Sequence, residues 1–159
     1  MLQYHMRILG IDPGLATTGW AIVDFDKNGD PEVIDYGCIS TEKGLPVSTR
    51  LLEIFNDMQE LIETFKPDLA GVETLIFYNN AKTAMNVGEA RGVVRVVLEQ
   101  NSIPVKEFTP LQVKSAVTGY GKAEKKQVQE NVKMLCNLDE IPKPDDAADA
   151  IAIAIASSS

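Results

Sequence analysis

The first forty residues carry apolar runs separated by turn-forming residues. The runs span residues 7–12, 19–23 and 33–39, and Asn28-Gly29 lies between the second and the third. Asn-Gly between two apolar runs favours a tight hairpin turn, because both residues tolerate the backbone angles that such a turn requires. We therefore expect the chain to open with three antiparallel strands.

Beyond residue 45 the spacing of apolar residues becomes that of helices alternating with short strands. Apolar positions three and four residues apart predict an amphipathic helix over 50–65, which Pro67 ends. The remaining predicted elements are strands over 69–73 and 104–108 and helices over 81–100, 110–118, 122–135 and about 145–156. This order favours an α/β fold, with a mixed five-stranded sheet that is parallel in its second part and has helices on both faces.

Length and composition fit one globular domain. The chain has 159 residues, of which 45% are hydrophobic and 24% charged, so it needs no disulfide or metal to fold. Its apolar runs are too short for a transmembrane helix. Two isolated cysteines, Cys38 and Cys136, and the lack of a signal-peptide pattern predict the reducing cytoplasm. With His5 as the single histidine, carboxylates and lysines must carry any catalysis.

The net charge of −8 argues at first against a nucleic-acid partner. However, residues 1–78 hold 5 basic and 13 acidic side chains, whereas residues 79–159 hold 10 of each. The second half includes a locally positive segment whose lysines are Lys114, Lys122, Lys125, Lys126 and Lys133. This segment suits a phosphate backbone, although a solvated helix face is the alternative interpretation.

Four carboxylates occupy positions that suggest a shared site. Asp12 ends the first strand, Glu73 ends the fourth, and Asp146 and Asp149 lie three residues apart on one face of the last helix. If the first and fourth strands are neighbours, their carboxyl ends bring Asp12 and Glu73 together. Four close anions repel one another unless a cation intervenes, and oxygen ligands favour Mg²⁺ or Mn²⁺. Two such ions would suit the displacement of a phosphodiester.

Each acid also has an ordinary structural interpretation. Asp145 or Asp146 would cap the last helix and favour its positive end. Asp12 would be a turn residue before Pro13-Gly14, and Glu73 a surface residue at a strand end. Asp149 lies too far into the helix for a capping role, which makes the shared site the stronger hypothesis.

Several motifs in one order resemble those of the RuvC family of Holliday-junction resolvases, over about residues 6–156. They are Gly10–Gly14 with Gly19, Val72-Glu73, Asn79–Ala84, Gly88–Gly92, Gln112–Lys114, Gly119–Lys125 and Asp146–Ala150. The first motif alone would be a weak signal, because actin-like and sugar-kinase folds also begin with a strand and a glycine turn. The resemblance is specific because all of these motifs occur in the same order as in the RuvC family.

The resemblance implies an RNase H-like fold and a metal-dependent crossover junction endonuclease of DNA recombination and repair. It implies that Asp12, Glu73, Asp146 and Asp149 are catalytic and hold two Mg²⁺ ions, for which Mn²⁺ substitutes. Symmetric hydrolysis of a four-way junction would leave 5′-phosphate and 3′-hydroxyl ends.

The resemblance also implies how other residues and partners take part. Lys125 would be catalytic at the scissile phosphate, and Gly14 would allow a close backbone approach to the site. The expected DNA contacts are Lys114, Lys122, Lys126 and Phe77. A homodimer would form through the helix that carries Gly88 and Gly92, and RuvA and RuvB, the branch-migration complex, would be partners.

The chain departs from the family pattern in three places. Many members have an aromatic residue three places after the glutamate, where this chain has Ile76, so Phe77 is the candidate to stack on a base. Residues 1–5 are expected to be an extension or tag remnant, and residues 6–159 a single nuclease domain. The chain ends soon after the last helix, where many relatives carry a further tail.

Two other classes of function remain as alternatives. A relative of the same fold could grip branched DNA without cutting it, but four intact acids argue against this. An actin-like phosphotransferase needs two such lobes, and 159 residues supply one.

Overall fold

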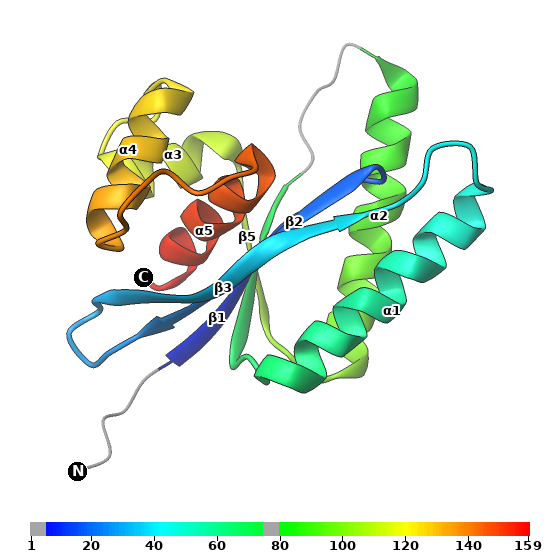
Figure 1. Ribbon diagram of the computed structural model, residues 1–159, viewed down its shortest axis with the longest axis horizontal. Helices are drawn as coiled ribbons and strands as arrows, with labels where there is room; N and C mark the ends of the chain where they lie inside the picture. Colours follow the sequence, from blue (N-terminus) through cyan, green and yellow to red (C-terminus); the bar gives the residue numbers. More distant parts are fainter. Residues whose placement is uncertain (1–5, 75–79) are drawn as a thin grey trace.

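The computed structural model describes residues 6–74 and 80–159. One mixed sheet of five strands, in the order β3-β2-β1-β4-β5, separates two helical layers (Figure 1). The strands are β1 (Met6–Asp12), β2 (Thr17–Phe25), β3 (Pro31–Ser40), β4 (Leu69–Glu73) and β5 (Val105–Phe108). The helices are α1 (Val47–Phe65), α2 (Ala81–Gln100), α3 (Pro110–Thr118), α4 (Lys125–Leu135) and α5 (Asp145–Ser157). The predicted α/β architecture is therefore confirmed.

The sheet register determines which strand ends meet. Strand β1 pairs antiparallel with β2 and parallel with β4, with Ile11 opposite Val72. Strand β5 continues the parallel part beside β4. Asp12 and Glu73, each one residue beyond that pair, therefore emerge at the same edge of the sheet.

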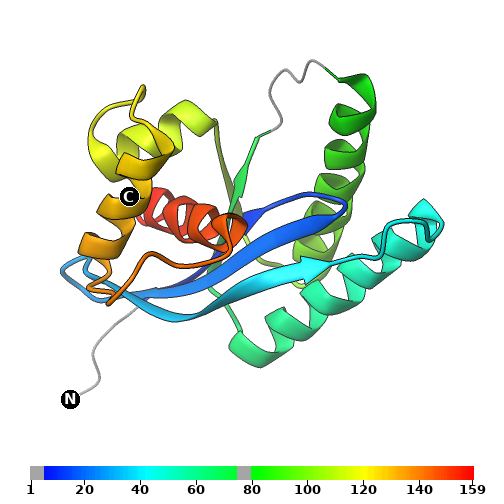
Figure 2. The same cartoon turned by 45° about the horizontal axis from the view of Figure 1, so that its top comes forward.

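Each face of the sheet buries its own apolar cluster. Helices α1 and α2 cover one face, where Ile54, Met58 and Ile62 supply the buried stripe of α1. Helix α5 covers the other face, and α3 and α4 pack on its outer side (Figure 2). Because α5 lies between the sheet and two helices, it is apolar almost all round, as its sequence predicts. Within the described residues, no helix combines the length and hydropathy needed to cross a bilayer.

Three glycines let α5 lie directly on the strands. A Cβ atom on Gly10 would overlap the carbonyl oxygen of Ala150, and one on Gly71 would overlap Oγ of Ser157. A Cβ atom on Gly19 would overlap the carbonyl oxygen of Asp146, in the first turn of α5. Since Gly19 pairs with Asp12 across β1 and β2, this contact holds the start of α5 beside the end of β1.

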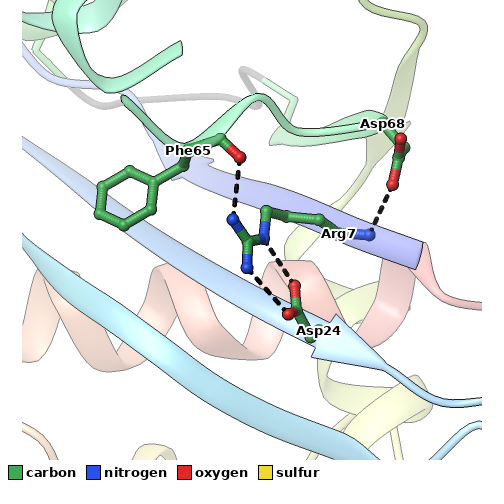
Figure 3. Close-up of polar contacts among 4 residues, drawn as sticks. All are labelled: Arg7, Asp24, Phe65 and Asp68. Atoms are coloured by element: carbon green, nitrogen blue, oxygen red, sulfur yellow. Dashed lines mark hydrogen bonds and ion pairs between the residues drawn. The ribbon is translucent and has the colours of Figure 1, made fainter. Parts of the chain in front are cut away.

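Arg7 ties three segments together at the other end of β1 (Figure 3). Its Nε and Nη2 donate to the two carboxylate oxygens of Asp24 at 2.8 and 3.0 Å, and its Nη1 donates to the carbonyl of Phe65 at 3.0 Å. The Arg7 backbone N–H donates to Asp68 at 2.8 Å. This arrangement joins β1 to β2 and to the α1–β4 connection. It stabilises the end of the sheet that lies opposite the acids.

The structure corrects two local expectations and adds a reason for the glycine at position 14. Helix α4 begins at Lys125 rather than at residue 122, because the backbone N–H of Ala123 closes a turn onto Tyr120 first. The residue before α5 is Pro144, which cannot cap by a side-chain hydrogen bond, so neither Asp145 nor Asp146 is the N-cap. A Cβ atom on Gly14 would overlap the carbonyl of Thr17, so the β1–β2 turn itself requires this glycine.

Candidate active site

Three aspartates gather where β1 ends and α5 begins. Asp12, Asp146 and Asp149 each offer a carboxylate oxygen, and these oxygens lie within 4.8 Å of one another. The three-residue spacing of Asp146 and Asp149 places both on the face of α5 that meets β1. Two elements far apart in sequence thus supply one acidic cluster.

Glu73 completes the group from the end of β4. Its carboxyl group shares a hydrogen bond with that of Asp12 and lies close enough to Asp149 to repel it electrostatically. The parallel pairing of β1 and β4 is the cause, because it places both strand ends side by side. All four predicted acids are therefore neighbours in the structure.

The site holds more negative charge than its surroundings accommodate. Burial, followed by repulsion from Glu73, Asp149 and Asp146, raises the pKa of Asp12 to about 8. Burial is also the main cause that raises the pKa of Glu73 and of Asp149. Hard oxygen donors whose ionised forms repel one another fit a divalent cation such as Mg²⁺, which would favour the ionised forms.

Two lysines face this acidic group. Nζ of Lys125 lies 3.4 Å from Oδ2 of Asp145 and 3.8 Å from Oδ2 of Asp149. Burial lowers the pKa of Lys125, but the charges of Asp149 and Asp145 outweigh it and raise the pKa overall. The positive charge of Lys114 opposes the rise in the pKa of Glu73.

Both lysines and two of the acids line one hollow of about 200 Å³. Glu73, Asp149, Lys114 and Lys125 form its polar wall, over an apolar floor that includes Val113. The hollow combines acids suited to a cation with cations suited to a phosphate. Such a site can bind a phosphodiester and stabilise negative charge that develops on it.

The other lysines predicted to contact DNA do not line the hollow that holds Lys114 and Lys125. Lys122 lines a separate hollow with Tyr120, and Lys126 is exposed on α4 and lines neither that hollow nor the one that holds Lys114 and Lys125. Phe77 and Ile76 lie outside the described residues, so the expected stacking role stays a prediction. The sequence-based interpretation missed Asp145 as the partner of Lys125, because a carboxylate in a first turn is also what a capping role would require.

A pH dependence of stability follows from the raised pKa of Asp12. In the unfolded chain Asp12 ionises near pH 4, whereas in the folded protein it keeps its proton until about pH 8. The unfolded state therefore binds fewer protons between these values, and the free energy of unfolding should fall as pH rises. Thermal unfolding in EDTA should show a lower Tm at about pH 8 than at about pH 5.5. Millimolar Mn²⁺ should restore more stability at the higher pH.

The matched control for this prediction is Asp12→Asn, which removes the titrating group with little change in shape. In EDTA its Tm should depend less on pH than that of the wild type over the same range. Equal slopes in the two proteins would contradict the assignment of the pH dependence to Asp12.

The sheet order and the acids at the β1 and β4 ends define an α/β protein of the RNase H-like class. The family model described as "Crossover junction endodeoxyribonuclease RuvC" matches residues 8–157. The chain belongs to the RuvC family of metal-dependent endodeoxyribonucleases, which act in DNA recombination and repair.

Relatives and solved structures agree with this assignment. The chain is 56% identical over 151 residues to a crossover junction endodeoxyribonuclease RuvC of Brevibacillus brevis, covering 94% of this chain and 90% of that one. A structure of Thermus thermophilus RuvC in complex with a Holliday junction substrate superposes with a TM-score of 0.91 at 32% identity, covering 95% and 92%. The yeast mitochondrial resolvase Ydc2, at 17% identity and a TM-score of 0.67, shares the fold, with 96% and 79% covered.

Proposed function

We propose that this chain resolves four-way DNA junctions by hydrolysing one phosphodiester in each of two opposing strands. The observation that carries the proposal is the meeting of Asp12, Glu73, Asp146 and Asp149 beside Lys114 and Lys125. The match to a RuvC bound to a Holliday junction supports the choice of substrate. The products would be 5′-phosphate and 3′-hydroxyl ends.

The four acids would hold two Mg²⁺ ions, or Mn²⁺ in their place. When bound, these ions supply Lewis acidity at the attacked phosphate. Asp12, with Glu73 or Asp149, would hold the two ions, because Asp12 lies close to the three other acids. Lys125 would stabilise the charge that develops on the phosphate, and Lys114 would position the strand.

A labelled synthetic four-way junction tests this function. Incubation with Mg²⁺ should give paired cuts at symmetric positions on opposite strands, and incubation with EDTA should give none. Binding that is unaffected by Mg²⁺ and leads to no cut would instead favour a DNA-binding relative without nuclease activity. The expected partnership with RuvA and RuvB, the cytoplasmic location and the single domain over 6–159 remain predictions.

The two lysines should differ in what their loss changes. Lys125→Ala should lower the single-turnover cleavage rate by about 10²–10³-fold with little change in affinity, as expected for a group that acts on the transition state. Lys114→Ala should mainly weaken binding and reduce the slope of log K against log[salt] by about one. Cleavage rates and fluorescence anisotropy measure the two effects separately.

Lys27→Ala is the control for these lysines, because Lys27 is exposed in the β2–β3 turn at the other end of the sheet. It should match the wild type in both measurements. Equal losses of affinity in Lys114→Ala and Lys125→Ala, with no separate change in rate, would remove Lys125 from the catalytic group.

We further propose a homodimer formed through α2. Ala90, Val94, Val97 and Leu98 bury one side of α2 against the rest of the subunit. On other sides, Met85 and Val96 are 65% and 59% exposed. A helix that is apolar on more than one side needs a second partner, and the small residues Ala84, Gly88 and Gly92 would let an identical helix approach closely.

Gly92→Leu should therefore weaken dimerisation without unfolding the subunit. A Cβ atom on Gly92 meets no heavy atom of the described chain within 4 Å, so the subunit leaves room where the larger side chain begins. Overpacking should cost roughly 1–3 kcal/mol per inserted side chain, and a two-fold axis doubles it. Analytical sedimentation should show more monomer, and junction cleavage should give single rather than paired nicks.

Glu99→Leu, exposed near the far end of α2, is the control for added apolar surface and should stay dimeric. A Gly92→Leu protein that is fully dimeric and makes paired cuts would place the interface on another surface.

A further inference from the structure

A second and larger hollow, of about 620 Å³, opens on the other side of the acid cluster. Asp149 and Glu73 line the hollow that contains Lys114 and Lys125, whereas Asp146 lines this second one. Its walls come from the β1–β2 turn, the β3–α1 connection with the first turns of α1, and the first turns of α2. No described residue lines both hollows, and acids of one cluster line each of them, so the two hollows flank the acids.

The floor of the second hollow contains a buried arginine with unused donors. Arg50 is 9% exposed, and its Nε donates to Oγ1 of Thr41 at 2.8 Å. Oγ1 of Thr41 in turn donates to the carbonyl of Leu15 at 2.6 Å. Within residues 6–74 and 80–159, neither Nη atom of Arg50 has a hydrogen-bond partner, and no carboxylate lies within 4 Å of it. Thr41 thus orients a guanidinium whose two outer nitrogens remain available.

A buried charge without a counter-ion is costly unless a ligand or water supplies acceptors. In a structural arginine such as Arg7, both Nη atoms and Nε are engaged by protein oxygens. Among the described residues, Arg50 is held at one nitrogen, and it lines a hollow of about 620 Å³. This difference indicates that the partner of its Nη atoms is none of the described residues.

The charge around Arg50 indicates what that partner is. Lys43 and Lys82 are exposed and also line the hollow, where Asp146 is the single acid among the lining residues. Three cations therefore gather at one place in a chain whose net charge is −8. The planar fork of a guanidinium matches two oxygens of a phosphate, and ammonium groups act as point charges beside it.

We propose that Arg50 binds a phosphodiester group of the substrate strand, next to the phosphate that is cut. Lys43 and Lys82 would contact the neighbouring phosphates of the same strand. This inference rests on the proposed function, since it extends the path of the same strand. The strand would enter beside Lys114 and Lys125, cross the acids and continue over Arg50. Cations on both sides of the acids would offset their repulsion of the DNA backbone.

The test compares junction binding by Arg50→Gln, Arg50→Lys and wild-type protein over a range of salt concentrations in EDTA. Arg50→Gln should weaken binding by about 10–100-fold and reduce the slope of log K against log[salt] by about one. Arg50→Lys should keep the slope, because it keeps the charge, but regain only part of the affinity, because it lacks the fork. Lys27→Gln should leave both values unchanged.

The exposed lysines keep the test decisive if loss of the Arg50–Thr41 hydrogen bond unfolds the protein. Lys43→Gln with Lys82→Gln cannot disturb the core and should reduce the same slope by about two. The inference would be overturned if the Arg50→Gln protein bound the junction with wild-type affinity and an unchanged salt slope. If Arg50→Gln does not fold, the same result in the double lysine variant would overturn it. Failure of the wild type to bind a junction would overturn both this inference and the proposed function.

Free phosphate could occupy the same site in place of a DNA phosphodiester, and a second experiment distinguishes these two ligands. Inorganic phosphate should raise the Tm of wild-type protein more than chloride at equal ionic strength if the hollow holds a free anion. If phosphate stabilises the wild type but not Arg50→Gln, and both proteins bind the junction with the same salt slope, then the site is one for free phosphate and the strand assignment is wrong.

Discussion

Asp149→Asn is expected to abolish junction cleavage while junction binding persists. The asparagine keeps the shape of the side chain but removes the negative charge that a divalent cation requires, and the loss of a metal ligand forfeits several kcal/mol of transition-state stabilisation. Single-turnover cleavage should therefore fall by at least about 10³-fold. Anisotropy should show equal or tighter binding, because one anion fewer repels the DNA backbone.

Asp145→Asn is the matched control for this prediction. Asp145 lies in the first turn of α5, four residues before Asp149, and contacts Lys125, but it is not one of the three aspartates whose oxygens lie within 4.8 Å of one another. Its substitution should change the cleavage rate by less than about 10-fold, a loss that corresponds to about 1.4 kcal/mol. Asp12→Asn should behave like Asp149→Asn.

Thermal unfolding gives an independent readout of the same assignment. Millimolar Mn²⁺ should raise the Tm of wild-type and Asp145→Asn protein and should do so much less for Asp149→Asn, because the ion binds the folded cluster. Wild-type cleavage by Asp149→Asn would exclude Asp149 from the metal site and leave the face of α5 without a catalytic role.

Gly10→Ala is expected to have the largest effect on stability. The new Cβ would overlap the carbonyl oxygen of Ala150 and lie 2.9 Å from the backbone nitrogen of Ala154. Both atoms belong to the backbone of a buried helix, so no change of rotamer relieves the clash and α5 must move away from the sheet. The cost should reach or exceed the upper part of the roughly 1–3 kcal/mol range for overpacked cores.

Urea unfolding measures this change, with Gly92→Ala as the control. Gly92 lies inside α2 with open space around its Cβ position, so alanine should stabilise the subunit by about 0.4–1 kcal/mol. Because the displaced α5 carries Asp146 and Asp149, Gly10→Ala should also lower cleavage in the fraction that stays folded. Wild-type stability of Gly10→Ala would mean that α5 packs less closely on β1 than described.

Local patterns were sufficient for most elements and for the four acids. The boundaries predicted for 69–73, 81–100 and 110–118 agree with β4, α2 and α3. The start and stop signals of a helix act over a few residues and are therefore visible in sequence, as in α3, which Thr109 caps and Gly119 ends. The order of elements left the pairing of the first and fourth strands as a condition, and the structure meets that condition, which brings Asp12 and Glu73 together.

The features that escaped sequence-based prediction depend on contacts between distant segments. Nothing near Arg50 in the chain distinguishes it from an ordinary helix residue. Its proposed role depends on the hydrogen bond to Thr41, nine residues away, and on a hollow that residues of α2 also line. Likewise, Lys114 and Lys125 share a hollow, whereas Lys122 lies in the turn before α4 and lines a different one. Residue type and spacing select the acids and the elements, but only the packing of α5, α1 and α2 around the sheet decides which cations surround those acids.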